Sequence, residues 1–196
     1  MRPNRMKQNW REGRHVTVGW LGIGSPHSAE VMARLGFDAL CVDMQHGLID
    51  YNDVWPMFQA ISQTDTVPIV RVPWNDPQMI MKVLDAGAYG VIVPLINNAQ
   101  EAARAVAACR YPPDGIRSYG PIRAAAYGGS DYAAHANQEI VVLGMIETKD
   151  GIKNLEEICA TPGLDGVYVG PADLSYALDL PPMADKPNPI HIEMCD

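Results

Sequence analysis

The chain has 196 residues, 47% of them apolar and 19% charged, and its 15 basic and 23 acidic residues give a formal net charge of −8. This composition is that of an ordinary globular protein, which excludes a disordered or collagen-like chain. The acidic balance argues against a protein that coats nucleic acid, because such a protein carries a basic stripe.

No apolar run approaches the ~20 residues that cross a bilayer, and the charged N-terminal segment contains no hydrophobic secretory signal. We therefore expect neither a membrane nor a nucleic-acid partner. The four cysteines, Cys41, Cys109, Cys159 and Cys195, are widely spaced and lack the pairing of a zinc site. Reduced thiols in a cytoplasmic protein are the expectation.

Short apolar segments alternate with helical patterns along most of the chain. Strands are expected at 16–23, 37–42, 67–72, 89–93, 140–145 and 166–169, and helices at 26–35, 51–63, 76–86, 98–109, 148–160 and 171–177. Pro26, Asn52, Asp76 and Pro77 are typical of helix starts. Residues 111–139 show no period, and a connection of that length is usually functional. The proline-rich stretch 180–196 predicts no element.

Strands that are apolar on both faces and separated by helices predict a parallel sheet covered by helices. Two architectures fit, the (β/α)₈ barrel and the doubly wound sheet. The sequence GIGSPH after the first strand lacks the third glycine and the acidic partner of a dinucleotide fingerprint. We therefore expect a single α/β domain over residues 1–196, a TIM barrel that lacks its last two βα units and is C-terminally incomplete.

Polar residues follow several of the predicted strands, at the edge where parallel α/β folds carry their chemistry. His46 and Asp43 follow the second strand, Arg71 ends the third, Glu147 follows the fifth and Asp173 follows the sixth. Taken singly, each could be a loop histidine, a surface ion-pair member or a first-turn helix acid. Their placement at one edge favours a functional site.

Two carboxylates without a Cys or His pair suit a hard cation such as Mg²⁺ or Mn²⁺. Such an ion could chelate a 2-keto acid and stabilise its enolate, with an arginine beside the oxygen. A histidine could move the proton, oriented by Asp85 or Asp43. A Schiff-base mechanism would need a lysine inside the barrel, and none of the lysines falls within a predicted strand.

Seven segments in order resemble the HpcH/HpaI aldolases, which are metal-dependent class II pyruvate aldolases. The segments are GWLGIGSPHSAE, VDMQHG, PIVRVP, LDAGAYGVIVP, YPPDGIRSYGP, GMIET and VGPADLS. The resemblance implies a (β/α)₈ barrel of the phosphoenolpyruvate/pyruvate type that forms a homo-oligomer, a trimer or a hexamer. It also implies a divalent cation, Mg²⁺, Mn²⁺ or Co²⁺.

The resemblance assigns roles to individual positions. It implies metal binding by Glu147 and Asp173, catalysis by His46 and Arg71, and support of that histidine by Asp85. It implies that Arg71 and a substrate-binding turn contact the pyruvate moiety. The residues of this turn are Gly170, Pro171, Ala172 and Asp173. Three residues of the aperiodic segment, Arg117, Tyr119 and Arg123, are candidates for the aldehyde side, with loop or interface packing as the alternative. Met145 departs from the family, many members of which have glutamine there.

The activity that the resemblance implies is reversible cleavage of a 4-hydroxy-2-keto acid to pyruvate and an aldehyde through a metal-bound pyruvate enolate. A 2-keto-3-deoxy sugar acid or a hydroxy-keto diacid is the expected substrate. Two alternatives stay open, a CoA-ester lyase of the citrate- or malyl-CoA type and a barrel without catalytic activity.

Overall fold

A computed structural model describes residues 1–182 and 188–195. Its centre is a parallel sheet of six strands whose order in space, β1 to β6, is their order in the chain. The strands are β1 (Val18–Leu21), β2 (Ala39–Asp43), β3 (Val67–Arg71), β4 (Gly90–Val93), β5 (Val141–Ile146) and β6 (Gly166–Val169). All six overlap the predicted segments.

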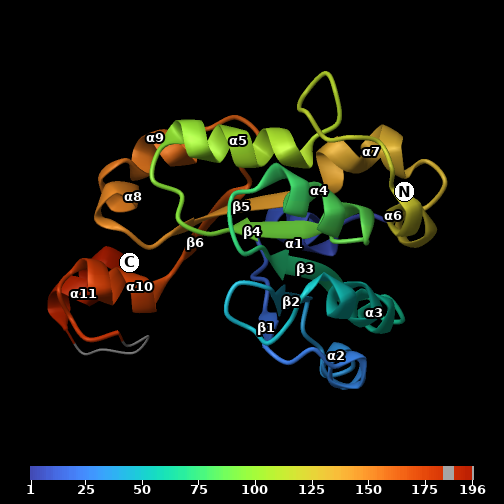
Figure 1. Ribbon diagram of the computed structural model, residues 1–196, viewed down its shortest axis with the longest axis horizontal. Helices are drawn as coiled ribbons and strands as arrows, with labels where there is room; N and C mark the ends of the chain where they lie inside the picture. The colour runs from blue at the N-terminus through green and yellow to red at the C-terminus, as the bar shows by residue number, and fades with distance from the viewer. Residues whose placement is uncertain (183–187, 196) are drawn as a thin grey trace.

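Helices connect successive strands and cover the outer face of the sheet (Figure 1). Among the described residues they are α1 (Arg5–Arg11), α2 (Pro26–Ala33), α3 (Tyr51–Ile61), α4 (Pro77–Asp85), α5 (Ala99–Cys109), α6 (Ile122–Gly128), α7 (Tyr132–Glu139), α8 (Lys149–Lys153), α9 (Leu155–Cys159), α10 (Pro171–Ala177) and α11 (Pro189–Cys195). Asp76 caps α4 with Pro77 in the first turn, as predicted. The cap of α3 is Asp50, in a capping box with Asp53, and not Asn52.

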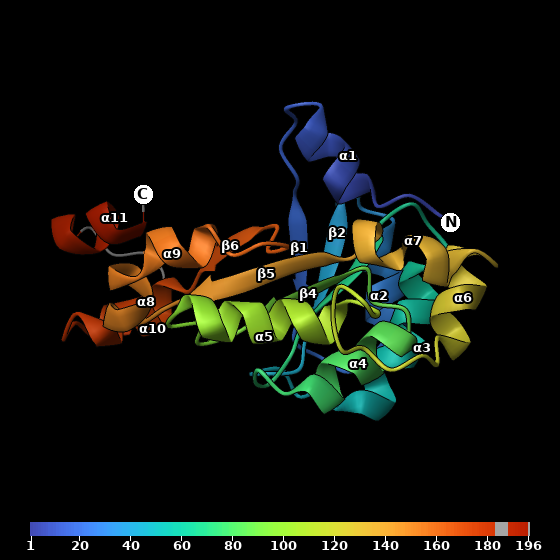
Figure 2. The ribbon, with the colours of Figure 1, turned by 90° about the horizontal axis from the view of Figure 1, so that it is seen from above.

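The sheet is strongly curled. Figure 2 shows β1 and β2 running across the direction of β5, and the curl brings the inner faces of the two outermost strands together. Trp20 of β1 stacks on Tyr168 of β6, with ring centroids 5.4 Å apart. A doubly wound sheet reverses its strand order at a switch point, whereas this order is sequential. The architecture is therefore the curled parallel sheet of a (β/α) barrel.

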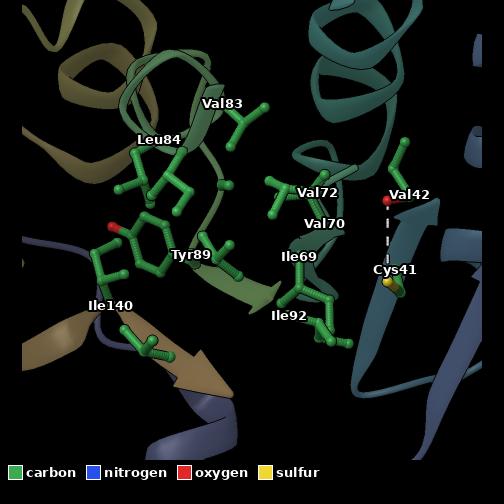
Figure 3. Packing of buried hydrophobic residues seen from close by; sticks show 14 of the residues in the cluster. Cys41, Val42, Ile69, Val70, Val72, Val83, Leu84, Tyr89, Ile92 and Ile140 are labelled. Carbon is green, nitrogen blue, oxygen red and sulfur yellow. Dashed lines mark hydrogen bonds between the residues drawn. The ribbon is translucent and has the colours of Figure 1, made fainter. Parts of the chain in front are cut away.

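The core lies between the sheet and its helices. Every residue of β2, β3 and β4 is buried, because side chains inside a barrel and under the helices are both shielded from water. Figure 3 shows Val83 and Leu84 of α4 facing the sheet, and Tyr89 lies between α4 and β4. Cys41 is buried in the same core, as predicted for a small apolar residue.

Several helices depart from the sequence-based expectations. The aperiodic segment 111–139 contains α6 and α7, neither of which has a side-chain cap, and Asp131 before α7 binds the amino group of Met1 instead. The expected helix at 148–160 is divided into α8 and α9 at Asn154. Helices α1 and α11 are not predicted. Residues 183–187 of the proline-rich stretch lie outside the described residues.

Cys109 is also buried, whereas Cys159 is exposed, and neither forms a disulfide with Cys41. In the part of the chain that the structure describes, every helix is too short or too polar to span a bilayer.

Candidate active site

The predicted polar residues gather at the carboxyl edge of the sheet. Asp43 is the last residue of β2 and Arg71 the last of β3, and the strand register pairs them side by side. Glu147 directly follows β5, and Asp173 lies in the first turn of α10, which follows β6. Parallel strands bring these ends to one edge, so the expected grouping of strand ends is confirmed.

Asp43 and Arg71 form a buried two-pronged ion pair. Arg71 Nε donates to Asp43 Oδ1 at 2.8 Å, and Nη2 donates to Oδ2 at 2.5 Å. Trp20 Nε1 donates to the same Oδ2 at 3.1 Å, and its ring lies 5.0 Å from the guanidinium carbon. Burial raises the pKa of Asp43, but the hydrogen bonds from Arg71 and Trp20 outweigh it and hold that pKa below its usual value.

His46 stands on a tight turn that the same carboxylate organises. Oδ1 of Asp43 accepts from the backbone N–H groups of Gln45 and His46, at 3.1 and 3.3 Å. Gly47 closes the turn, because a Cβ there would collide with the carbonyl oxygen of Asp43. The His46 side chain is exposed, so it stands at the rim where a ligand would arrive.

The side chain of Glu147 is buried, and only one of its two carboxylate oxygens has a hydrogen-bond partner. Its Oε1 accepts from the backbone N–H of Leu95 at 2.8 Å, while Oε2 is buried and has no hydrogen-bond partner. Leu95 holds that N–H in place with a φ of 55°, a left-handed conformation that is uncommon outside glycine. A Cβ on Gly170 would lie 2.6 Å from Oε2, so only glycine lets this backbone approach the carboxylate.

The pKa of Glu147 reports which charges lie near it. Burial raises the pKa; the Leu95 N–H lowers it, the charge of Asp173 raises it, and Arg71 and His46 lower it. Three of the predicted residues, His46, Arg71 and Asp173, therefore lie within electrostatic reach of Glu147.

This geometry fits a hard divalent cation. A buried carboxylate oxygen without a partner, with the carboxylate of Asp173 near it, is a donor set that suits a positive ion. In the part of the chain that the structure describes, no group of three or more His, Cys, Asp or Glu side chains is placed to hold a metal ion by itself. Two carboxylates suit Mg²⁺ and Mn²⁺, because these ions accept one or two carboxylates and fill the remaining positions with water and substrate.

Met145, the last residue but one of β5, contacts the arginine. Its Sδ lies 3.9 Å from Arg71 Nη1. The other two nitrogens of the guanidinium are bound to Asp43. Because a thioether is a weak acceptor, Nη1 is the nitrogen with donor capacity left for a ligand.

Asp85 is not brought to His46 within one copy of the chain. It ends α4, which returns the chain to the amino edge of the sheet, opposite Glu147. There its Oδ1 accepts from Arg117 Nη2 at 2.8 Å. A single chain in this fold does not form the predicted contact between Asp85 and His46.

The three aldehyde-side candidates also lie toward the amino edge. Arg117 is buried and donates to the hydroxyl of Tyr132 at 3.0 Å, and Arg123 donates to the carbonyl of Ala86 at 2.7 Å. Tyr119 is exposed. They follow α5, which ends at the amino edge, so within one chain they do not face Glu147.

Sequence reasoning missed two contributors to the site. The sequence offers Asp43 as a candidate to orient His46, but the ion pair of Asp43 with Arg71 is indicated only by the register of two adjacent strand ends. Leu95 offers no signal at all, because leucine does not indicate a left-handed backbone.

The comparisons with known proteins identify the family of the chain. The family model described as HpcH/HpaI aldolase/citrate lyase matches residues 17–191. A hydroxypyruvate/pyruvate aldolase of Rhizorhabdus wittichii is 44% identical over 182 residues, which are 93% of this chain and 72% of that protein. A 4-hydroxy-2-oxo-heptane-1,7-dioate aldolase of Escherichia coli is 43% identical over 175 residues, 88% of this chain and 67% of that one.

Solved structures show the same fold. The crystal structure of an HpcH/HpaI aldolase/citrate lyase family protein from Burkholderia cenocepacia J2315 superposes with a TM-score of 0.89 at 38% identity. The match covers 98% of this chain and 77% of that one. The matched sequence, the strand order and the grouping of carboxylates at one edge lead to one conclusion: the chain belongs to the HpcH/HpaI aldolase/citrate lyase family.

Proposed function

We propose that the protein is a divalent-metal-dependent aldolase that reversibly cleaves a 4-hydroxy-2-keto acid to pyruvate and an aldehyde. The carrying observation is Glu147, whose buried Oε2 has no partner although Arg71 and Asp173 lie nearby. The names of relatives at 43–44% identity support the carbon–carbon lyase class. They also support a hydroxy-keto diacid or a related hydroxy-keto acid as substrate.

Glu147 and Asp173 would hold the cation, Mg²⁺, Mn²⁺ or Co²⁺. When bound, a divalent cation supplies a Lewis acid that polarises the keto group of the substrate. The Gly170–Asp173 turn would bind the substrate carboxylate. Pro171 has no N–H, so the donors there are the backbone N–H groups of Ala172 and Asp173, which a first helical turn leaves unused.

Cleavage breaks the C3–C4 bond and needs a base and an anion-stabilising donor. His46 accepts the proton of the C4 hydroxyl as the aldehyde forms, and the C3–C4 electron pair moves into the keto acid to give the enolate. Arg71 donates from Nη1 to the C2 oxygen, where negative charge builds up. The His46 imidazolium then returns the proton to C3, which yields pyruvate and restores the neutral base.

We also propose that the chain forms a homo-oligomer, a trimer or a hexamer, in the cytoplasm. Large apolar side chains such as Leu48, Trp74 and Ile122 are exposed, by 88, 59 and 91%. A cleft of about 460 Å³ between α3, α4 and α6, which Asp85 and Arg123 line, offers a concave surface for a neighbour. Sedimentation velocity should give a mass of three or six chains, and a monomer at micromolar concentration would contradict this assembly.

The activity is tested by pyruvate release, coupled to lactate dehydrogenase, from 4-hydroxy-2-oxo-heptane-1,7-dioate and from a 2-keto-3-deoxy sugar acid. The assay is run with chelator and with added Mn²⁺, for wild type, Glu147→Gln and the surface control Glu157→Gln. We expect release that requires Mn²⁺, falls by roughly 10²–10³-fold in Glu147→Gln and is retained in Glu157→Gln. Undiminished release in chelator, or in Glu147→Gln, would contradict the proposal.

A further inference from the structure

Resting on this proposed function, we propose that Asp43 is a positioning residue that sets Arg71 and His46 relative to one another. The carboxylate holds the guanidinium with Nη1 turned toward the substrate. It also holds the turn that carries the imidazole. Arg71, which donates to the developing oxyanion, and His46, which carries the proton, are thereby both held by one carboxylate at the end of β2.

Both carboxylate oxygens of Asp43 already accept hydrogen bonds from the groups that Asp43 holds in place. Oδ1 accepts from Arg71 Nε and from the backbone N–H groups of Gln45 and His46. Oδ2 accepts from Arg71 Nη2 and from Trp20 Nε1. A carboxylate that receives five donors has no lone pair in a good direction for a cation or a substrate. Asp43 therefore acts through its neighbours and not on the reacting atoms.

The fork geometry of the pair fixes the orientation of Arg71. Two parallel hydrogen bonds to a carboxylate define the plane of a guanidinium as well as its position. Trp20 supports that plane from one side, and Trp20 is itself stacked on Tyr168 across the barrel. Nη1 then points away from Asp43, beside the sulfur of Met145.

The chain supplies a matched control at the opposite end of the same strand. Asp38, just before β2, also accepts a backbone N–H and side-chain donors, from Thr17 and Asn9. Asp38→Asn makes the same chemical change as Asp43→Asn, far from Arg71. A general effect of weakening β2 should appear in both variants, and a positioning effect in Asp43→Asn alone.

We expect Asp43→Asn to lower kcat for pyruvate release by about 10- to 100-fold, because a misplacement of roughly 1 Å has effects of that size. KM should change less than about threefold, and Asp38→Asn should retain kcat within about twofold. In an Arg71→Ala background, Asp43→Asn should lower kcat by a smaller factor than in wild type, because the part of its effect that passes through Arg71 is already lost. A wild-type kcat in Asp43→Asn, or an undiminished loss in the Arg71→Ala background, would overturn the proposal.

A second readout needs no turnover. Proton–nitrogen NMR of the arginine Nε–H groups should show a slowly exchanging Arg71 signal in wild type and Asp38→Asn, and its loss in Asp43→Asn. A signal retained in Asp43→Asn overturns the positioning role even if the enzyme is active. If the wild type cleaves no hydroxy-keto acid, the proposed function fails, and this signal still decides whether Asp43 holds Arg71.

Should Asp43→Asn fail to fold, Asp43→Glu takes its place. It keeps the carboxylate but moves it by one methylene, so the Arg71 signal should return while kcat stays below that of wild type. Wild-type kcat in Asp43→Glu without the Arg71 signal would overturn the proposal.

Discussion

The two edges of the sheet pair their buried charges differently. At the amino edge, Arg117 uses its two terminal nitrogens on Asp85 and Tyr132, and its Nε is buried without a partner. At the carboxyl edge, Glu147 keeps one carboxylate oxygen unpaired and Arg71 keeps one nitrogen beside a sulfur. Burying an unpaired polar atom costs free energy at both edges. We expect the amino-edge ion pair to serve stability and the carboxyl edge, where parallel α/β folds carry their chemistry, to serve catalysis.

The largest expected effect is a loss of activity without a loss of stability, for a substitution at the carboxyl edge. Glu147→Gln should lower kcat by roughly 10²–10³-fold, the usual cost of removing one electrostatic stabiliser. Its free energy of unfolding should not fall, because burial raises the pKa of Glu147 and makes the ionised form costly in the folded protein at pH 7. Urea unfolding beside the kinetic assay checks both; a large loss of stability would contradict this account.

The complementary change belongs to the amino edge. Arg117→Met removes a buried cation from its partners Asp85 and Tyr132. We expect a loss of about 2 kcal/mol in the free energy of unfolding, below the 3–5 kcal/mol of a fully buried pair, because the Asp85 side chain is 28% exposed. Urea unfolding should rank this loss above that of Glu147→Gln, and the reverse order would break the comparison.

A smaller effect depends on pH. The pKa of Asp43 is lower in the folded protein than the ordinary value near 3.9, so its ionised form stabilises the fold above about pH 4. The stability lost in Asp43→Asn should be full at pH 7 and shrink as the pH falls below about 4 toward the folded pKa. Asp38→Asn should show the same trend, because the backbone hydrogen bond from Thr17 lowers the pKa of Asp38. A stability difference that grows on acidification would contradict the pairing.

The smallest effect concerns the backbone that holds Glu147. Leu95 adopts a φ of 55°, which glycine tolerates and a β-branched residue does not. Leu95→Val should therefore be less stable than Leu95→Gly by about 1–2 kcal/mol. Both retain the N–H that binds Glu147. Equal thermal stability of the two variants would show that this conformation is not maintained in solution.

The sequence predicts the parts of this molecule that depend on periodicity and strand order. Six apolar segments mark the six strands, and the polar residues at or after their ends mark the carboxyl edge, among them His46, Arg71, Glu147 and Asp173. Strand ends in a parallel sheet must meet at one edge, so this part of the site required no knowledge of side-chain contacts.

Tertiary contacts decide the remainder. Helices α6 and α7 lack side-chain caps and gain their order from packing, as in the contact of Arg117 with Tyr132. The family resemblance assigned Asp85 a role beside His46, yet helix α4 ends at the opposite edge of the sheet. The left-handed turn at Leu95 leaves no trace in the residue type. These features depend on which groups meet in space, and periodicity carries no such information.

The most direct test of the account is a Mn²⁺ titration followed by electron paramagnetic resonance, in wild type and in three carboxylate variants. We predict one site per chain in wild type, lost or weakened at least tenfold in Glu147→Gln and Asp173→Asn at the carboxyl edge. Asp85→Asn at the amino edge should bind Mn²⁺ as the wild type does. Undiminished binding in Glu147→Gln, or a loss confined to Asp85→Asn, would contradict the assignment of chemistry to the carboxyl edge.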